Sequence, residues 1–102
     1  PVFRNCSFVN NRAAVGAGVW LAGGRGNASA SFLNCAFVGN QASGLGGAIF
    51  NQSDPLGTVN PVIFNCLFER NTAGTQGGAI YNNGFFIGTA SPFITNCAFV
   101  SN

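Results

Sequence analysis

Few side chains in this sequence can do acid–base, nucleophilic or metal chemistry. The chain of 102 residues has two carboxylates, Asp54 and Glu69, and no histidine. Polysaccharide lyases and hydrolases need clustered carboxylates, to hold calcium or to exchange protons with the substrate. Asp54 begins a proline-containing turn, where aspartate is common for structural reasons, and Glu69 forms a solvated pair with Arg70. The sequence therefore predicts no catalytic residues, and we expect the chain not to be an enzyme.

The cysteines are the remaining reactive groups, and they occupy one equivalent position at intervals of 29, 31 and 31 residues. If these positions stack, neighbouring Cα atoms lie about 4.8 Å apart, which is within the range of a disulfide. Parallel side chains hold their Cβ atoms farther apart than a good bridge requires, so two interpretations stay open: buried free thiols that act as small hydrophobes, or bridges. With no histidine and no Cys-x-x-Cys pair, we expect no metal site and no cofactor.

Aromatic and cationic side chains could instead bind a partner. Trp20 and Tyr81 could stack on sugars, but they lie at or beside positions that isoleucine and phenylalanine fill in other copies, which favours packing for Trp20. Arg25 lies in a Gly-Gly-Arg-Gly loop that could contact a partner or simply be a surface loop. The net charge of +2 is too small and scattered to predict nucleic-acid binding. No apolar run approaches the roughly 18 residues that a membrane span requires.

The elements that hold these residues form a repeat of about 30 residues. Its first half reads Asn-Cys-x-Phe-x-x-Asn, followed in the first three copies by an alanine two residues later, and its second half contains a recurring glycine 12 residues after the cysteine. Four anchors that recur in register indicate a repeat protein. We place the repeats at residues 1–29, 30–60, 61–91 and, as a partial copy, 92–102, within a single solenoid segment.

Each copy is expected to contain three short strands. The first is a run at 1–4, 30–33, 61–64 and 92–95, and its third residue should point inward. The second is Cys-x-Phe, and the third lies at 19–21, 48–50 and 79–81. Asn-Cys is expected to form a tight bend because asparagine tolerates the left-handed backbone region. The segments 22–29, 51–60 and 82–91 are expected to be variable loops.

Three short strands per copy, with turns between them and no helical period, predict one coil of a parallel β-solenoid. Stacked coils place like residues on top of one another, so phenylalanines can stack and asparagine amides can bond up and down a column. Handedness follows the right-handed rule for parallel crossovers, which predicts a right-handed parallel β-helix of three full coils and a partial fourth. The expected structural columns are Cys6, Cys35, Cys66 and Cys97; Phe8, Phe37, Phe68 and Phe99; Asn11, Asn40, Asn71 and Asn102; and Gly18, Gly47 and Gly78.

The paired motifs Phe-x-x-Asn and Gly-Gly-Ala-(Ile/Leu/Val) resemble the repeats of the chlamydial polymorphic outer-membrane proteins. Four Phe-x-x-Asn copies, two clean Gly-Gly-Ala-Ile copies at Gly46 and Gly77, and a degenerate Ala17-Gly18-Val19 carry the resemblance. It implies a right-handed parallel β-helix of pectin-lyase type in a secreted or surface-displayed passenger that often adheres. The membrane-embedded β-barrel to which such passengers are attached is not part of this sequence.

Three functional classes fit these observations. The first is a non-enzymatic structural or adhesive module at the cell surface or outside the cell, which stacks end to end into a longer solenoid or a fibre. The second is a carbohydrate-binding or polysaccharide-processing β-helix whose catalytic residues lie outside this segment, and the third is a structural spacer. The scarcity of carboxylates favours the first over the second. The expected partners are copies of the chain or adjoining coils, together with a host surface or glycan, without nucleic acid or membrane insertion.

Overall fold

The structure is a computed structural model that describes residues 1–85 and 87–102. All regular secondary structure in these residues is β-strand, which confirms the predicted all-β class. Within the described part of the chain, no helix is long and apolar enough to cross a membrane.

The strands fall into four successive layers along the chain. The first layer contains β1 (Val2–Arg4), β2 (Ser7–Val9), β3 (Arg12–Val15) and β4 (Val19–Ala22). The second contains β5 (Ser31–Leu33), β6 (Ala36–Val38), β7 (Gln41–Leu45), β8 (Ile49–Ser53) and β9 (Thr58–Val59). The third contains β10 (Val62–Phe64), β11 (Leu67–Glu69), β12 (Thr72–Ala73), β13 (Ile80–Gly84) and β14 (Thr89–Ala90), and the fourth contains β15 (Phe93–Thr95) and β16 (Ala98–Val100).

Strands of successive layers pair in parallel and build five sheets that run along the solenoid. Sheet A is β1-β5-β10-β15, sheet B is β2-β6-β11-β16, sheet C is β3-β7-β12, sheet D is β4-β8-β13, and sheet E is β9-β14. In sheet B the register places like residues beside each other, because Phe8 pairs with Phe37, and Phe37 with Phe68. This arrangement confirms the predicted parallel β-solenoid of about three turns.

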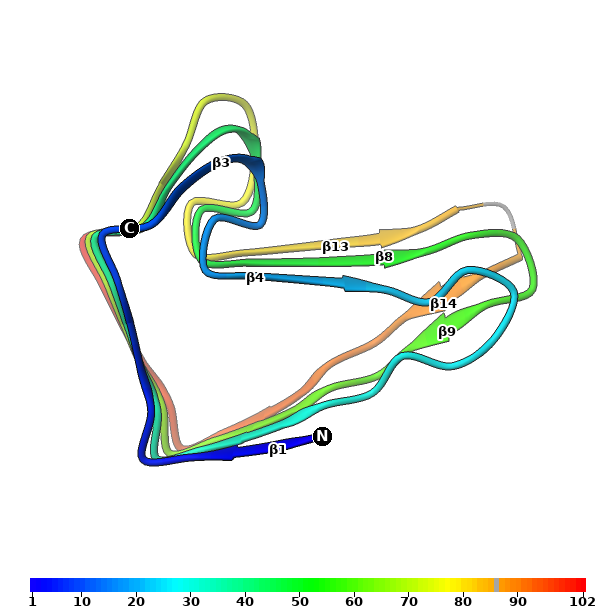
Figure 1. Cartoon of the computed structure of the whole chain (residues 1–102), viewed down its shortest axis with the longest axis horizontal. Helices are drawn as coiled ribbons and strands as arrows, with labels where there is room; N and C mark the ends of the chain where they lie inside the picture. Colours follow the sequence, from blue (N-terminus) through cyan, green and yellow to red (C-terminus); the bar gives the residue numbers. More distant parts are fainter. Residues whose placement is uncertain (86) are drawn as a thin grey trace.

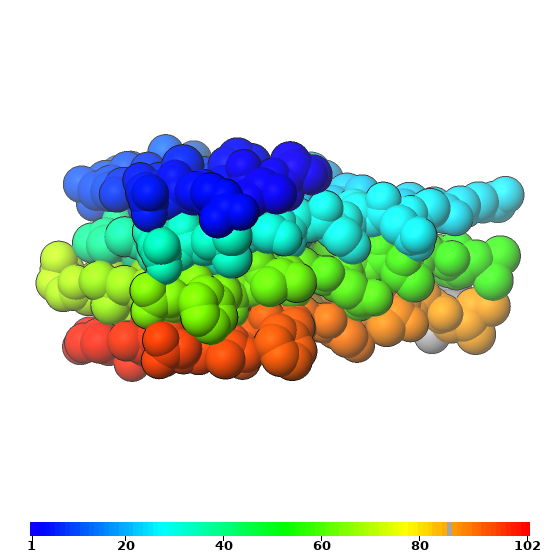
Figure 2. All heavy atoms as spheres, turned by 90° about the horizontal axis from the view of Figure 1, so that it is seen from below, coloured from blue at the N-terminus to red at the C-terminus, as the bar shows by residue number. Residues whose placement is uncertain are grey.

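The coil winds to the right. In Figure 1 the chain passes from β1 to sheet B, then through sheets C and D, clockwise as it recedes from the viewer. Figure 2 shows the same chain from the side, with the layers in sequence order from the N-terminal to the C-terminal one. Sheets D and E extend away from the centre as a narrow wing, whose strands return toward sheet A (Figure 1).

Each full coil has more strands than the three that the sequence predicts. The sequence predicts no strand in the segment that follows the asparagine, but this segment forms the strands of sheet C. The segments 51–60 and 82–91 were expected to be loops, but they extend sheet D and form sheet E. These strands were missed because small and polar residues fill them, so they lack the alternation of apolar and polar residues that marks a strand.

Left-handed residues form the corners of the coil. The asparagine before each cysteine has a positive φ, between 52° and 55°, as the sequence predicts: Asn5, Asn34, Asn65 and Asn96. Glycine turns the chain between sheets C and D, where Gly16, Gly46 and Gly77 have φ of 52°, 65° and 69°. These corners fix which side chains of the short strands point inward.

The core lies between sheets A, B and D. Phe32, Phe37, Phe68, Ile49 and Ile63 are fully buried there. The rings of the phenylalanine column in sheet B are nearly parallel, with centroids 4.7 or 4.8 Å apart. Phe37 also meets Phe32 of sheet A edge to face, at 5.6 Å and 70°. In the first two layers the rings of Phe3 and Phe32 therefore interlock with those of sheet B, while Ile63 and Ile94 fill the same position in the next two layers.

Candidate functional site

Titratable side chains do not gather anywhere in the described part of the chain. No group of three or more Cys, Asp or Glu side chains could hold a metal ion there. Asp54 is exposed in the wing, where its carbonyl accepts the Gly57 N–H of a turn, and Glu69 pairs with the neighbouring Arg70. The two carboxylates therefore sit on different elements, each in a local structural setting.

The asparagine column runs through the buried corner between sheets B and C. The Asn40 amide donates to Asn71 Oδ1 and to the carbonyl of Phe8, both at 2.9 Å, while its Oδ1 accepts from the Asn11 amide and backbone N–H. Asn71 repeats the pattern toward Asn102 Oδ1 and the Phe37 carbonyl. Asn40 and Asn71 are fully buried, so these bonds satisfy polar groups that would otherwise be costly to bury.

The bonds between the asparagines themselves all run from the amide of one layer to the Oδ1 of the next, which gives the column a direction. At the N-terminal end, Asn11 Oδ1 accepts no hydrogen bond from the described residues. At the other end, Asn102 donates one amide hydrogen to the Phe68 carbonyl, which leaves the second for another acceptor. The N-terminal face thus offers an acceptor and the C-terminal face offers a donor.

The four cysteines form a column of free thiols between sheets A and B. Cys66 Sγ donates to the carbonyls of Phe64, in its own layer, and Phe32, in the preceding one. Burial raises the pKa of the Cys66 thiol from 9.0 to about 11, and the neighbouring thiols of Cys97 and Cys35 add to this effect. Because thiolate is the reactive form, the Cys66 thiol acts as an inert packing group.

The glycine column predicted from sequence needs a correction in the first layer. The N–H of Gly18 bonds to the carbonyl of Ala48, and Val19 pairs with Ile49, so Gly18 is equivalent to Ala48 rather than to Gly47. A register shift between Ala13 and Val15 accounts for the offset. Gly47 itself needs to be glycine, since a Cβ there would lie 2.0 Å from the carbonyl oxygen of Gly78.

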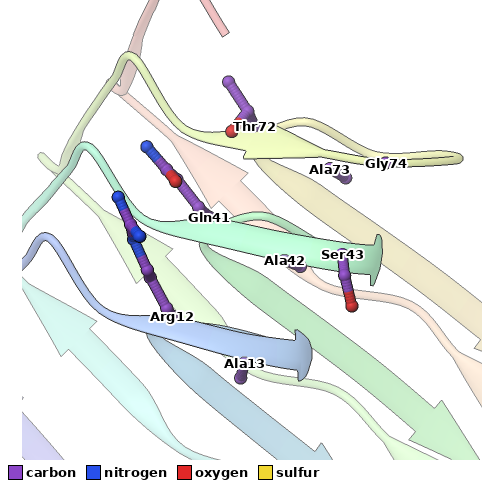
Figure 3. A pocket seen from close by; sticks show the side chains of 8 residues that line it. All are labelled: Arg12, Ala13, Gln41, Ala42, Ser43, Thr72, Ala73 and Gly74. Carbon is purple, nitrogen blue, oxygen red and sulfur yellow. The ribbon is translucent and has the colours of Figure 1, made fainter.

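Residues of sheet C line a shallow groove of about 350 Å³. Each of three successive strands adds one alanine to the lining, and Figure 3 shows that Arg12, Gln41 and Thr72 project from these strands in one direction. Sequence analysis missed this groove, although the matching triplets Gln41-Ala42-Ser43 and Thr72-Ala73-Gly74 signal it. It can offer hydrogen bonds and one cation to an extended ligand.

A second aromatic column lies on sheet D. Trp20, Phe50 and Tyr81 stack with centroids 6.2 and 5.6 Å apart, both pairs at 28°. Phe50 is buried, whereas Trp20 is 55% exposed because no further layer covers it. The tryptophan therefore packs through one face and presents surface to solvent.

The ends of the solenoid are apolar. In the last layer, Phe99 is 49% exposed and Ile94 is 40% exposed, although both belong to columns that are fully buried at Phe68 and Ile63. The outer face of sheet A also exposes apolar groups, above all Phe93 at 66%. Three of the four arginines, Arg4, Arg12 and Arg25, lie in the first layer, so positive charge gathers at the N-terminal end.

The fold and these surfaces define a class: a repetitive, right-handed β-solenoid module without a concentrated catalytic site in its described residues. Within that class, two segments, residues 34–52 and 65–83, match the Chlamydia polymorphic membrane protein repeat. These two segments are therefore similar to the repeats of that family, as the sequence motifs predict. The matches lie in the second and third copies of the repeat, where each runs from the asparagine before the cysteine into the strand of sheet D. The first and last copies, which also carry the motifs described above, lie outside the matched segments. No curated protein and no solved structure matches the chain significantly.

Proposed function

We propose that this chain is a non-enzymatic structural module, exposed at the cell surface or outside the cell, that lengthens a rod by stacking coil on coil. The observation that carries the proposal is that the same asparagine hydrogen bonds and the same phenylalanine stacking join each pair of successive layers. A further coil with this repeat can make the same contacts with the layer beside it. Solenoid stability is approximately a sum over repeats and the interfaces between them, so each added coil adds an interface of the same kind.

The direction of the asparagine column supports head-to-tail contact. An adjoining coil at the N-terminal face would place an amide donor over Asn11, as Asn11 does over Asn40. Head-to-tail contacts join different surfaces, so they propagate instead of closing. An adhesive role is assigned to the outer faces, because sheet A exposes apolar groups and sheet C offers its groove to a host surface or glycan.

Electron microscopy and sedimentation of the chain test the stacking. Rods of uniform width should appear as concentration rises, and Phe99→Asp should abolish them because a charge would enter the apolar end face. Phe93→Asp is the matched control, since Phe93 is also an exposed phenylalanine of the last layer but lies on the outer side. A wild-type chain that stays monomeric at high concentration contradicts the proposal.

A second candidate function, glycan binding, is favoured by the exposed face of Trp20 at the end of its aromatic column. Aromatic faces and polar grooves are what sugars require for stacking and hydrogen bonding. Trp20 is the only tryptophan, so its fluorescence reports on this surface alone. A saturable change in Trp20 emission on titration with an oligosaccharide would move the assignment to glycan binding. Arg12→Gln should abolish this change if the groove binds the sugar, and Tyr81→Ala should abolish it if the aromatic column does.

A further inference from the structure

The groove on sheet C crosses three layers of the solenoid. Its lining takes a stretch from each of β3, β7 and β12, and the register aligns Arg12 with Gln41 and Gln41 with Thr72. Figure 3 shows these three side chains pointing the same way. The middle stretch, Gln41-Ala42-Ser43, has a described layer on either side. The groove is therefore a feature of the stacked layers themselves and not of either end of the solenoid.

The polar side chains of the middle stretch have no partner within the described residues. Gln41 and Ser43 are exposed, and neither side chain makes a hydrogen bond with another described residue. The asparagines at the corner between sheets A and B differ, because Asn65 bonds to Asn34 and Asn96 bonds to Asn65. The groove thus offers an amide and a hydroxyl, each of which can donate and accept.

An extended peptide does not suit this groove. Peptides bind sheets by adding a strand to an unpaired edge, but β7 lies between β3 and β12 and has no such edge. The N–H of Gln41, for example, already donates to the carbonyl of Asn11 at 2.8 Å. The side chains on one face of an extended peptide also recur about every 6.8 Å, whereas the layers recur about every 4.8 Å.

A linear glycan suits the groove better. A pyranose unit advances such a chain by about the thickness of one layer, so each layer can face one unit. Sugar hydroxyls donate and accept, as the groups of Gln41 and Ser43 do, and the C–H groups of the rings can pack against the alanines of the lining. The volume of about 350 Å³ lies at the lower end of the range for ligand pockets, which suits a short chain.

Charge narrows the class of glycan. The lining includes the guanidinium of Arg12 and no carboxylate, so the groove is positive at the layer of β3. Arginine binds a carboxylate through two parallel N–H···O bonds, which are stronger than bonds between neutral groups. A sugar with a carboxylate is therefore favoured at this layer, and neutral sugars are favoured beside Gln41 and Thr72.

We propose that the sheet C groove binds a short linear oligosaccharide along the solenoid, one unit per layer, with an acidic sugar beside Arg12. This inference rests on the glycan-binding candidate function, to which it gives a site and a ligand class. It does not depend on the stacking of coils.

NMR titrations of the whole chain with trisaccharides test the inference. The acidic probes are sialyllactose and a cellotriose whose terminal glucose is oxidised to glucuronate. Both should bind saturably, at one site per chain, and shift the amide signals of β3, β7 and β12 more than those of sheet A. Unmodified cellotriose differs from the second probe only in the carboxylate, and it should bind at least about tenfold more weakly.

Variants of the lining identify the groups that bind. Arg12→Gln should weaken binding of both acidic probes by at least about tenfold and leave that of cellotriose unchanged. Arg25→Gln is the matched control, because it removes the same charge from a loop outside the groove. Thr72→Val removes a hydroxyl but keeps the shape of the side chain, so it should weaken binding of all three sugars severalfold. Its control is Thr89→Val on sheet E, and the melting temperatures should stay within a few degrees because these positions are exposed.

The outcomes separate this inference from both candidate functions. Failure of both acidic probes to bind, equal affinity for the two forms of cellotriose, or equal losses in Arg12→Gln and Arg25→Gln would overturn it. Binding that Tyr81→Ala abolishes and Arg12→Gln leaves intact would overturn the inference while it supports glycan binding through the aromatic column. Rods formed by a chain that binds no sugar would overturn the inference and leave the stacking proposal standing.

Discussion

At the scale of single residues, alternation along each short strand decides which side chains enter the core. Ile63 is fully buried, whereas Phe64, one position later, is 44% exposed on the outer face of sheet A. Phe68 is fully buried like Ile63, because its ring points inward and stacks between Phe37 and Phe99. Hydrophobicity alone does not separate Phe64 from Phe68, but their positions in the repeat do.

Replacement of Phe68 by alanine should lower the free energy of unfolding by roughly 3–5 kcal/mol, because it opens a cavity in the aromatic column. Phe64→Ala is the matched control in the same layer and should cost much less, since its side chain is already partly in water. Glu69→Gln should change stability by no more than about 0.5 kcal/mol, as for most surface positions. Urea denaturation of the three variants measures the ranking, and equal losses for Phe68 and Phe64 would contradict the inside–outside assignment.

The raised pKa of Cys66 makes stability depend on pH in the alkaline range. The folded chain keeps this proton up to about pH 11, whereas an unperturbed thiol loses it near 9.0. The unfolded state therefore binds fewer protons between these values, and the free energy of unfolding should fall as pH rises from about 9 to 11. Denaturation curves of wild type and Cys66→Ala should diverge in this window, and parallel curves would contradict the assignment.

At the scale of elements, the sequence predicted the stacking but not all of the strands. In-register Cys, Phe and Asn residues sufficed to predict parallel layers, because each recurs where inter-layer contacts demand it. Sheet C and the wing were missed, since backbone hydrogen bonds between layers, not apolar side chains, define their strands. Gly18 was misaligned because the first copy has one residue fewer than the others between the asparagine and the glycine corner at Gly16. The groove on sheet C was not predicted either, because its residues belong to none of the in-register columns and show no alternation of apolar and polar side chains.

Close backbone contact between layers makes Gly47, just before the sheet D strand β8, sensitive to the addition of a side chain. Gly47→Ala should cost about 2–4 kcal/mol, because the new Cβ would meet two carbonyl oxygens of the third layer and force the layers apart. Gly26→Ala, in the first wing loop, serves as the control and should stay within about 0.5 kcal/mol. Thermal melts of both variants decide the matter: a Gly47→Ala chain as stable as wild type would mean that the layers separate there at little cost.

At the scale of the whole molecule, burial is greatest in the middle layers and least at the ends. Phe37 and Phe68 are fully buried, whereas Phe99, in the same column, is half-exposed. Solenoid stability is approximately a sum over layers and their interfaces, so terminal layers open first. Native-state hydrogen exchange should therefore give the slowest amides in β6 and β11 and the fastest strand amides in β15 and β16. Uniform protection across the four layers would instead indicate one cooperative unit.

The alignment of the inter-layer hydrogen bonds also has a mechanical consequence. In the asparagine column they join residues 29 or 31 positions apart, as between Asn40 and Asn71, and they lie along the direction in which the layers are stacked. A pulling force applied along that axis would load the bonds of the outermost layer first and peel it away alone. Each released layer is about 4.8 Å thick but holds enough chain to extend roughly 100 Å. A rod of such layers would therefore lengthen under tension in discrete steps and act as an extensible tether.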